Sequence, residues 1–149
     1  MTQAYTNRFV EVHELFGAVV DTYAPGVTTF LPYRSLAHHQ RGIAIVVIGD
    51  MAAGSTVDYA LWQATDAAGA NAKLVPGKAI TQLTQVGDDE GAVCVIELRT
   101  EELDVDNRFS FLGGVLTIGG GNVDLALLGF AGGSNQPPVP LTAWTEIVD

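Results

Sequence analysis

The sequence predicts an all-β fold, a two-sheet β-sandwich of the jelly-roll kind. Three observations predict it. The apolar runs are short, and they are separated by Gly, Pro, Asp and Asn residues. No amphipathic helix lies between consecutive runs. Short strands with turn residues between them are typical of sandwiches and barrels, whereas a parallel sheet needs helices between its strands. A length of 149 residues is near the commonest size of one domain, so a single soluble domain is expected.

Apolar runs and alternation place the strands. Residues 56–65 alternate most cleanly, with Val57, Tyr59 and Leu61 on one side, joined by Gln63. The predicted strands span residues 41–48, 56–65, 78–84, 93–98, 109–118 and 123–130. Between them we expect a loop over 66–77, an acidic turn over 87–91 and a glycine hairpin turn over 119–122.

The same alternation predicts the core, except over residues 41–48, which read as a run buried on both faces. We expect burial of Ile43, Ile45, Val47, Val57, Tyr59, Leu61, Val93, Val95, Phe109, Phe111 and Leu125. On this prediction, truncating Ile45 to Ala opens a core cavity and costs about 2–5 kcal/mol.

The two ends of the chain are predicted to differ from the core over 26–130. Residues 1–25 form an N-terminal arm or a short helix: Phe9, Val12, Phe16 and Val19 recur at helical spacing, but the valines of this segment also favour a strand. Residues 131–149 form a Gly/Pro-rich extended segment.

Trp144 and Ile147 follow the Gly/Pro-rich stretch and need something to pack against. An extended arm can add a strand to the sheet edge of a neighbour. Alternatively, it folds back as the last edge strand of its own sandwich. Only 16% of the residues are charged, which leaves little charge to cover the surface and favours a homo-oligomer or a lattice-bound subunit.

The charge balance argues against nucleic acid and anionic membranes as direct partners. The formal net charge is −10, and the 7 Lys and Arg residues are scattered rather than clustered. Residues 1–5 show no pattern of a signal peptide, and no apolar run reaches the roughly 20 residues of a membrane helix. Cys94 is the only cysteine and lies in an apolar run, so we expect a small packed side chain in a protein made in a reducing cytosol.

The sequence predicts no catalytic, cofactor-binding or metal-binding residue, and we do not expect an enzyme. The adjacent His38 and His39 would face opposite ways on a strand, and His13 lies far away in sequence. No serine stands in a nucleophile motif, and the glycines at 119–121 lack the Lys-Ser/Thr pair of a phosphate loop.

The acidic segment 101–107 is the densest group of oxygen ligands. Asp104, Asp106 and Asn107 have side chains suited to calcium, but the glycine and the distal glutamate of an EF-hand are missing. A solvated acidic loop is the simpler interpretation, and calcium binding stays open.

A resemblance extends over residues 25–130. It is carried by TTFLPYRSL at 28–36, the apolar strand 43–48 with Gly-Asp after it, GSTVD at 54–58, LWQATDAAG at 61–69, GKAITQL at 77–83 and EELDV at 101–105. These segments resemble the small virion structural proteins that tailed bacteriophages encode among their head genes. The resemblance implies a capsid cement or decoration protein, located in the virion after synthesis in the host cytoplasm, with the major capsid protein or other virion proteins as partners.

Two alternatives stay open at this stage. A head–tail connector or tail component would share the resemblance. A carbohydrate- or receptor-binding sandwich would instead need exposed aromatic side chains in a groove, for which Trp62 and Tyr59 are the candidates.

Overall fold

The computed structural model describes the backbone of residues 13–133 and the side chains of residues 19–133. The strands are β1 His13–Tyr23, β2 Gly26–Ser35, β3 Arg41–Met51, β4 Thr56–Ala64, β5 Lys73–Ala79, β6 Leu83–Thr84, β7 Val93–Arg99, β8 Phe111–Gly119 and β9 Val123–Gly132. Three short 3-10 turns, η1 Gln85–Gly87, η2 Thr100–Glu102 and η3 Val105–Asn107, complete the elements of this region, which contains no α-helix. None of its helical segments has the length and apolar character needed to cross a membrane.

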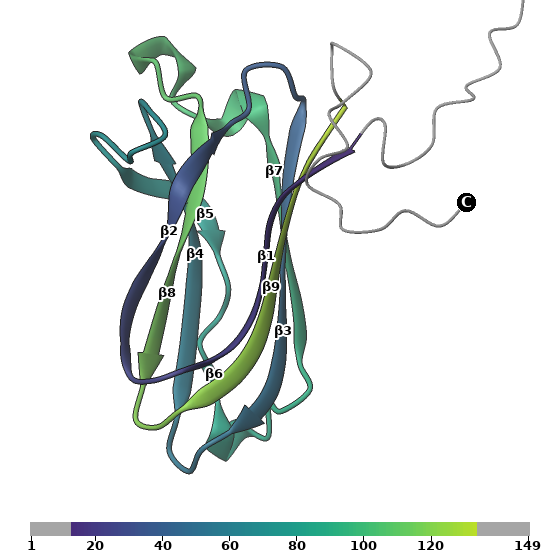
Figure 1. Cartoon of the computed structure of the whole chain (residues 1–149), viewed down its shortest axis with the longest axis vertical. Coiled ribbons are helices and arrows are strands. Elements are labelled where there is room, and N and C mark those ends of the chain that lie inside the picture. Colours follow the sequence, from purple (N-terminus) through teal and green to yellow (C-terminus); the bar gives the residue numbers. More distant parts are fainter. Residues whose placement is uncertain (1–12, 134–149) are drawn as a thin grey trace, which may run out of the picture.

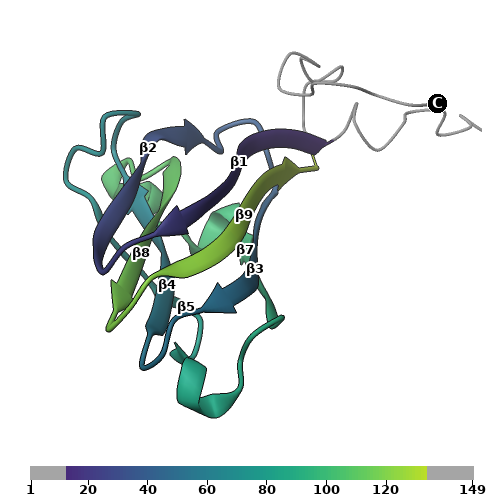
Figure 2. The same cartoon turned by 60° about the horizontal axis from the view of Figure 1, so that its bottom comes forward.

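Two antiparallel sheets face each other across the core (Figures 1 and 2). The first sheet has the order β1-β9-β3-β7, and the second has the order β2-β8-β4-β5, with β6 paired to β4. The consecutive strands β4, β5 and β6 all belong to the second sheet. Every other connection between consecutive strands crosses from one sheet to the other. This strand order is that of a jelly roll, so the predicted two-sheet sandwich is confirmed.

The N-terminal segment is a strand from His13 onward. β1 pairs with β9 from His13 opposite Gly132 to Tyr23 opposite Val123. The helical alternative is therefore wrong for residues 13–21, because the backbone hydrogen bonds of this segment go to a neighbouring strand. The sandwich also extends beyond the expected limits of 26 and 130, and residues 1–12 and 134–149 lie outside the described residues.

Two strands were not predicted, and both contain proline. β2 carries Pro32 within an irregular stretch between Phe30 and Arg34, and β5 carries Pro76 in a segment expected to be loop. Each is an edge strand of the second sheet, where a missing backbone N–H is tolerated. The strand expected over 78–84 is consequently wrong: it is divided between the end of β5 and the short β6.

The glycines at 119–121 form a turn, but not a hairpin, because β8 and β9 belong to different sheets. Gly120 has φ +76°, and a Cβ there would lie 2.1 Å from the carbonyl oxygen of Gly54 in the adjacent turn. Glycine is required here on both counts.

The inner faces of both sheets form one apolar core. As predicted, Val57, Tyr59 and Leu61 of β4 point into it, and so does Leu125. Phe109, which precedes β8, is buried as predicted. Gln63 is the polar member of the β4 face, only 2% exposed, and its Oε1 accepts a hydrogen bond from the backbone N–H of Asp104 at 2.8 Å. The buried amide oxygen is thereby satisfied, as a core position demands.

The predicted facing of β3 and β7 is wrong. In β3 the core side chains are Ala44, Val46 and Ile48, so the run is not buried on both faces. The predicted core residues Ile43, Ile45 and Val47 are half-buried on the outer face, Val93 and Val95 are exposed there, and Phe111 of β8 is half-buried. An unbroken apolar run has no polar side to mark the solvent, so either set of alternate residues fits the core equally well.

Candidate functional site

The outer face of the first sheet is apolar. Three cross-strand rows make it: Val95, Ile45 and Leu128; Val93, Val47, Ala126 and Val20; and Ile43 with Phe130. We call these nine side chains the apolar face. Val20 is 85% exposed, and Val93 and Val95 are 62% and 61% exposed. Opposite residues in an antiparallel sheet lie about 4.5–5.5 Å apart, so the rows form one continuous surface.

Charged and polar side chains stand at the ends of the apolar face. At one end, Arg41 on β3 forms an ion pair with Glu97 on β7, with 2.7 Å between Nη1 and Oε1. At the other end, the Thr22 hydroxyl donates a hydrogen bond to the Asp124 carboxylate. An apolar centre with a polar rim is the usual anatomy of a protein–protein contact.

The β7 edge of the first sheet is less accessible to another chain than the apolar face is. Lys78 on β5 donates a hydrogen bond from Nζ to the backbone oxygen of Glu97 on β7 at 2.8 Å. The ammonium group thus occupies an acceptor on the edge strand, one of the ways in which sheets avoid pairing with other chains. The apolar face of the first sheet is therefore more accessible than its β7 edge.

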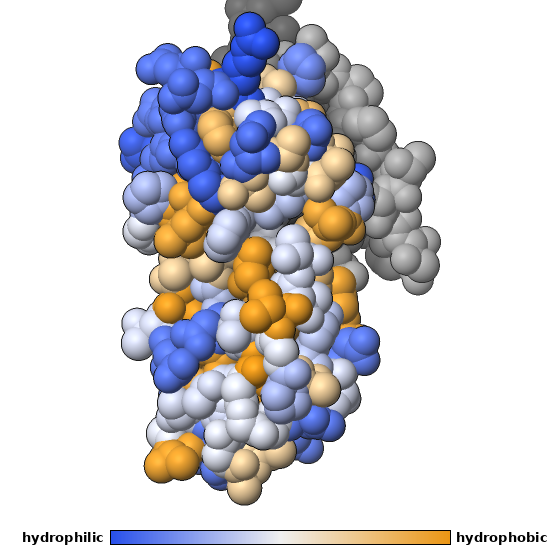
Figure 3. Space-filling view, turned by 90° about the vertical axis from the view of Figure 1, so that its left-hand side faces the viewer, coloured by the Kyte–Doolittle hydropathy of each residue, from blue (hydrophilic) through white to orange (hydrophobic). Residues whose placement is uncertain are grey.

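The outer face of the second sheet is mixed (Figure 3). A shallow groove of about 410 Å³ crosses it, lined by side chains that include Val27, Leu31 and Trp62. Trp62 is half-buried there, but Tyr59 is only 4% exposed and points into the core. Of the two aromatics expected for a carbohydrate groove, only Trp62 can contact a ligand on this face.

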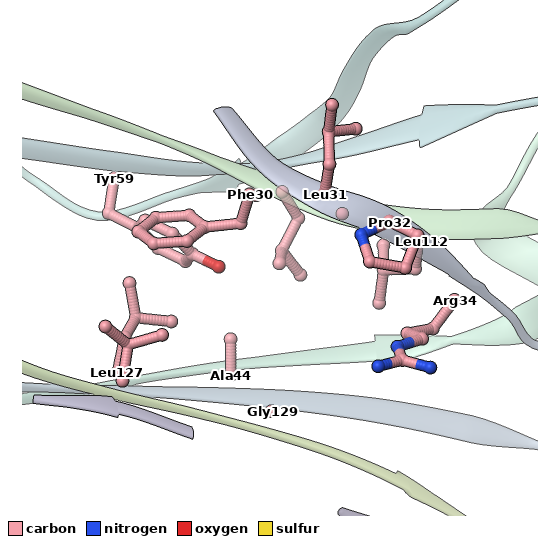
Figure 4. Close-up of a pocket in the computed structure, with 13 residues that line it drawn as sticks. Phe30, Leu31, Pro32, Arg34, Ala44, Tyr59, Leu112, Leu127 and Gly129 are labelled. Atoms are coloured by element: carbon pink, nitrogen blue, oxygen red, sulfur yellow. The ribbon is translucent and has the colours of Figure 1, made fainter. Parts of the chain in front are cut away.

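A cavity of about 290 Å³ lies between the sheets and opens beside β2 (Figure 4). Buried apolar side chains from both sheets form its inner wall: Ala44, Leu61, Leu112 and Leu127. Figure 4 shows the Tyr59 hydroxyl between the two sheets, with Phe30 beside its ring. Burial raises the pKa of Tyr59 strongly, so the hydroxyl stays protonated. Arg34 stands at the rim with its guanidinium toward the gap.

The acidic segment 101–107 is engaged with lysines. The Lys73 ammonium contacts the Asp104 carboxylate and also lies 4.0 Å from the centre of the Phe109 ring. Asn107 donates to the other Asp104 oxygen at 2.8 Å. Lys78 lies 2.9 Å from the Glu102 carboxylate. A cation thus already stands at Asp104, the carboxylate considered for calcium.

Both engaged carboxyls have lowered pKa values. The hydrogen bond from Lys73 lowers the pKa of Asp104 below its ordinary 3.8, with help from Asn107. The backbone N–H of Arg99 lowers the pKa of Glu102 below its ordinary 4.5, and Lys78 adds to this effect. In each case the contacts favour the charged form.

These shifts predict acid sensitivity in this loop. A lowered pKa in the folded state contributes stability that is present above the unfolded-state value and is lost as the pH falls through the folded one. We therefore expect Glu102→Gln with Asp104→Asn to reduce the change in unfolding free energy between pH 5 and more acidic conditions. Urea unfolding at a series of pH values measures it. Asp106→Asn, at an exposed position of the same loop, is the control, and an equal effect of the control would contradict the assignment.

The other residues considered in the sequence do not gather into a site. His38 is exposed and His39 is buried, and both lie in the turn after β2, where they line a hollow together with Arg34 and Ser35. Cys94 is half-buried against the core. Among the side chains that the structure describes, those of residues 19–133, no three of His, Cys, Asp or Glu are grouped as metal ligands would be.

The sequence did not reveal the apolar face or the cavity. Predicting the apolar face requires knowing which alternate residues of β3 and β7 point outward, and a continuous apolar run does not determine this. Predicting the cavity requires placing β2, and the strand pattern of β2 is interrupted at Pro32. One signal of the apolar face was present in the sequence. Residues 43–48 are apolar at every position, whereas a strand with one buried face needs apolar residues only at alternate positions.

No protein-family model matches the chain, and no curated protein matches it. Two solved structures have a similar course of the chain. A structure of infectious bursal disease virus, Gx strain, matches with a TM-score of 0.44 and 12% identity over 85% of this chain and 33% of that chain. The empty capsid of Triatoma virus matches with a TM-score of 0.43 and 9% identity over 89% of this chain and 93% of that chain. At these scores, neither likeness assigns a function to this chain.

Proposed function

We propose that this chain is a structural protein of a virus particle, and specifically a cement or decoration protein on the head of a tailed bacteriophage. In this role it binds the lattice of the major capsid protein and has no catalytic task. The observation that carries the proposal is the apolar face of the first sheet.

An apolar surface of this kind is stabilised by removal from water. Val20, Val93 and Val95 are more than half exposed in the isolated chain and lie in continuous rows with other apolar side chains. Contiguous exposed apolar patches on soluble proteins usually mark contacts with other proteins. A capsid lattice offers such a contact in many identical copies.

Charge and fold agree with this role. A net charge of −10 disfavours contact with packaged DNA. The jelly roll serves in viral capsid domains and in lectins, so the fold alone does not choose between them. The resemblance of residues 25–130 to phage head-gene products favours the virion, and the burial of Tyr59 weakens the carbohydrate-binding alternative.

A head–tail connector or tail component would use the same apolar face, and copy number separates it from a cement protein. Quantitative mass spectrometry of purified virions of the phage that encodes the chain is the test. A cement protein is expected at a fixed ratio to the major capsid protein, and a connector or tail protein at a few copies per particle. Absence from the particles, together with no sedimentation of the purified chain with empty shells, would overturn the virion role.

A further inference from the structure

Small residues in both sheets create the cavity between them. In the first sheet, Gly129 of β9 pairs with Ala44 of β3, and both residues line the cavity. In the second sheet, Gly114 of β8 lines it. Neither glycine sends a side chain into this part of the core, and the methyl group of Ala44 is short. The space therefore follows from the residue types at these positions.

The cavity is larger than a packing defect. Native cores are close-packed, with few voids larger than a water molecule. An engineered apolar cavity of about 150 Å³ stays dry and takes up benzene. The cavity between the sheets has a volume of about 290 Å³, close to the lower limit of small-molecule sites, about 300 Å³. It has room for a compact ring compound.

The inner wall selects a neutral and aromatic compound. Leu61, Leu112 and Leu127 line it and are at most 7% exposed, so a charged group placed among them would lose its hydration without compensation. The rings of Phe30 and Tyr59 also line the cavity, with 6.5 Å between their centres. Aromatic rings attract one another at such distances, which favours a ring as the ligand.

The Tyr59 hydroxyl adds a polar group to this apolar wall. Tyr59 is only 4% exposed, and Figure 4 shows its hydroxyl directed into the space between the sheets. The hydroxyl forms no hydrogen bond with the residues that the structure describes. Buried hydroxyls usually have a partner, and a hydroxyl can both donate and accept. A ligand with one N–H or O–H group would supply the missing partner.

We propose that the cavity between the sheets binds a small neutral aromatic compound whose single N–H or O–H group forms a hydrogen bond with the Tyr59 hydroxyl. The ring of the compound lies among the leucines of both sheets. The cavity is inside the sandwich, whereas the apolar face is on the outer side of the first sheet. The inference is therefore independent of the virion role.

Indole and indene, titrated into the full chain, test the proposal. The two compounds have nearly the same shape, but only indole carries an N–H group. Ligand-observed NMR measures both dissociation constants, and we expect both compounds to bind. Ala44→Leu should weaken both by about tenfold or more, because the larger side chain fills space that the ligand needs. Ala126→Leu, the same change on the outer face of the first sheet, should leave both constants unchanged. Circular dichroism checks that each variant is folded.

Tyr59→Phe is a second test that keeps the shape of the cavity. It should weaken indole by about two- to tenfold, the effect of one lost hydrogen bond, and leave indene unchanged. An equal effect on both compounds, or none on either, would exclude the hydroxyl from the site and overturn the proposal. Failure of both compounds to bind the unmodified chain would overturn it as well. Binding that Val95→Lys abolishes and Ala44→Leu leaves intact would place the compounds on the apolar face and also overturn it.

Discussion

Ile48→Ala is expected to lower the free energy of unfolding by about 2–5 kcal/mol, whereas Ile45→Ala on the same strand is expected to cost about 1 kcal/mol. Ile48 is 2% exposed and lies in the central cluster of the core. Ile45 is half-buried on the outer face, opposite Val95 and Leu128. The same atoms are removed in both variants, so the difference reports the facing of β3 alone.

Urea or guanidinium unfolding of the two variants makes the comparison, with unchanged m-values as a condition. Equal losses, or a larger loss for Ile45→Ala, would show that β3 has the opposite facing. The apolar face would then be part of the core.

Tyr33→Ala is expected to cost about 3–5 kcal/mol, the usual cost of deleting a buried aromatic side chain. The Tyr33 ring is 2% exposed and lies between two glycines, Gly113 of β8 and Gly69 of the loop after β4. A Cβ at Gly113 would be 2.1 Å from the ring, so the ring occupies the space that a side chain would need.

Tyr33→Phe is the matched control and should be neutral or slightly stabilising. The Tyr33 hydroxyl is buried and has no hydrogen-bond partner among the described residues. Removing a buried polar group that lacks a partner carries no cost in lost hydrogen bonds. The same unfolding measurement applies, and a loss of more than about 1 kcal/mol for Tyr33→Phe would show that the hydroxyl is bonded.

The sequence predicted the fold class because turn residues punctuate it. Residues 56–65 show the period of two so clearly that both the strand and its facing, Gln63 included, were correct. The facing of residues 43–48 and 93–95 could not be predicted in the same way, because the outer face of these strands is as apolar as the face that packs in the core.

The candidate site depends on features that emerge only in three dimensions. Arg34 and Leu127 are far apart in sequence, and they line one cavity because β2 and β9 lie in opposing sheets. The pairing of Lys73 with Asp104 also depends on β5, an edge strand that its Pro76 concealed. Local patterns report which residues are strands, but not which strands become neighbours.

Binding of two charged variants to empty capsid shells tests the central claim most directly. Val95 and Val27 are 61% and 69% exposed, each on the outer face of a different sheet. Val95→Lys places a charge in the apolar face and is expected to weaken co-sedimentation with shells by about tenfold or more, since burying an unpaired ammonium is costly. Val27→Lys should bind as the unmodified chain does. Unchanged binding of Val95→Lys, or loss confined to Val27→Lys, would contradict the assignment of the first sheet as the contact surface.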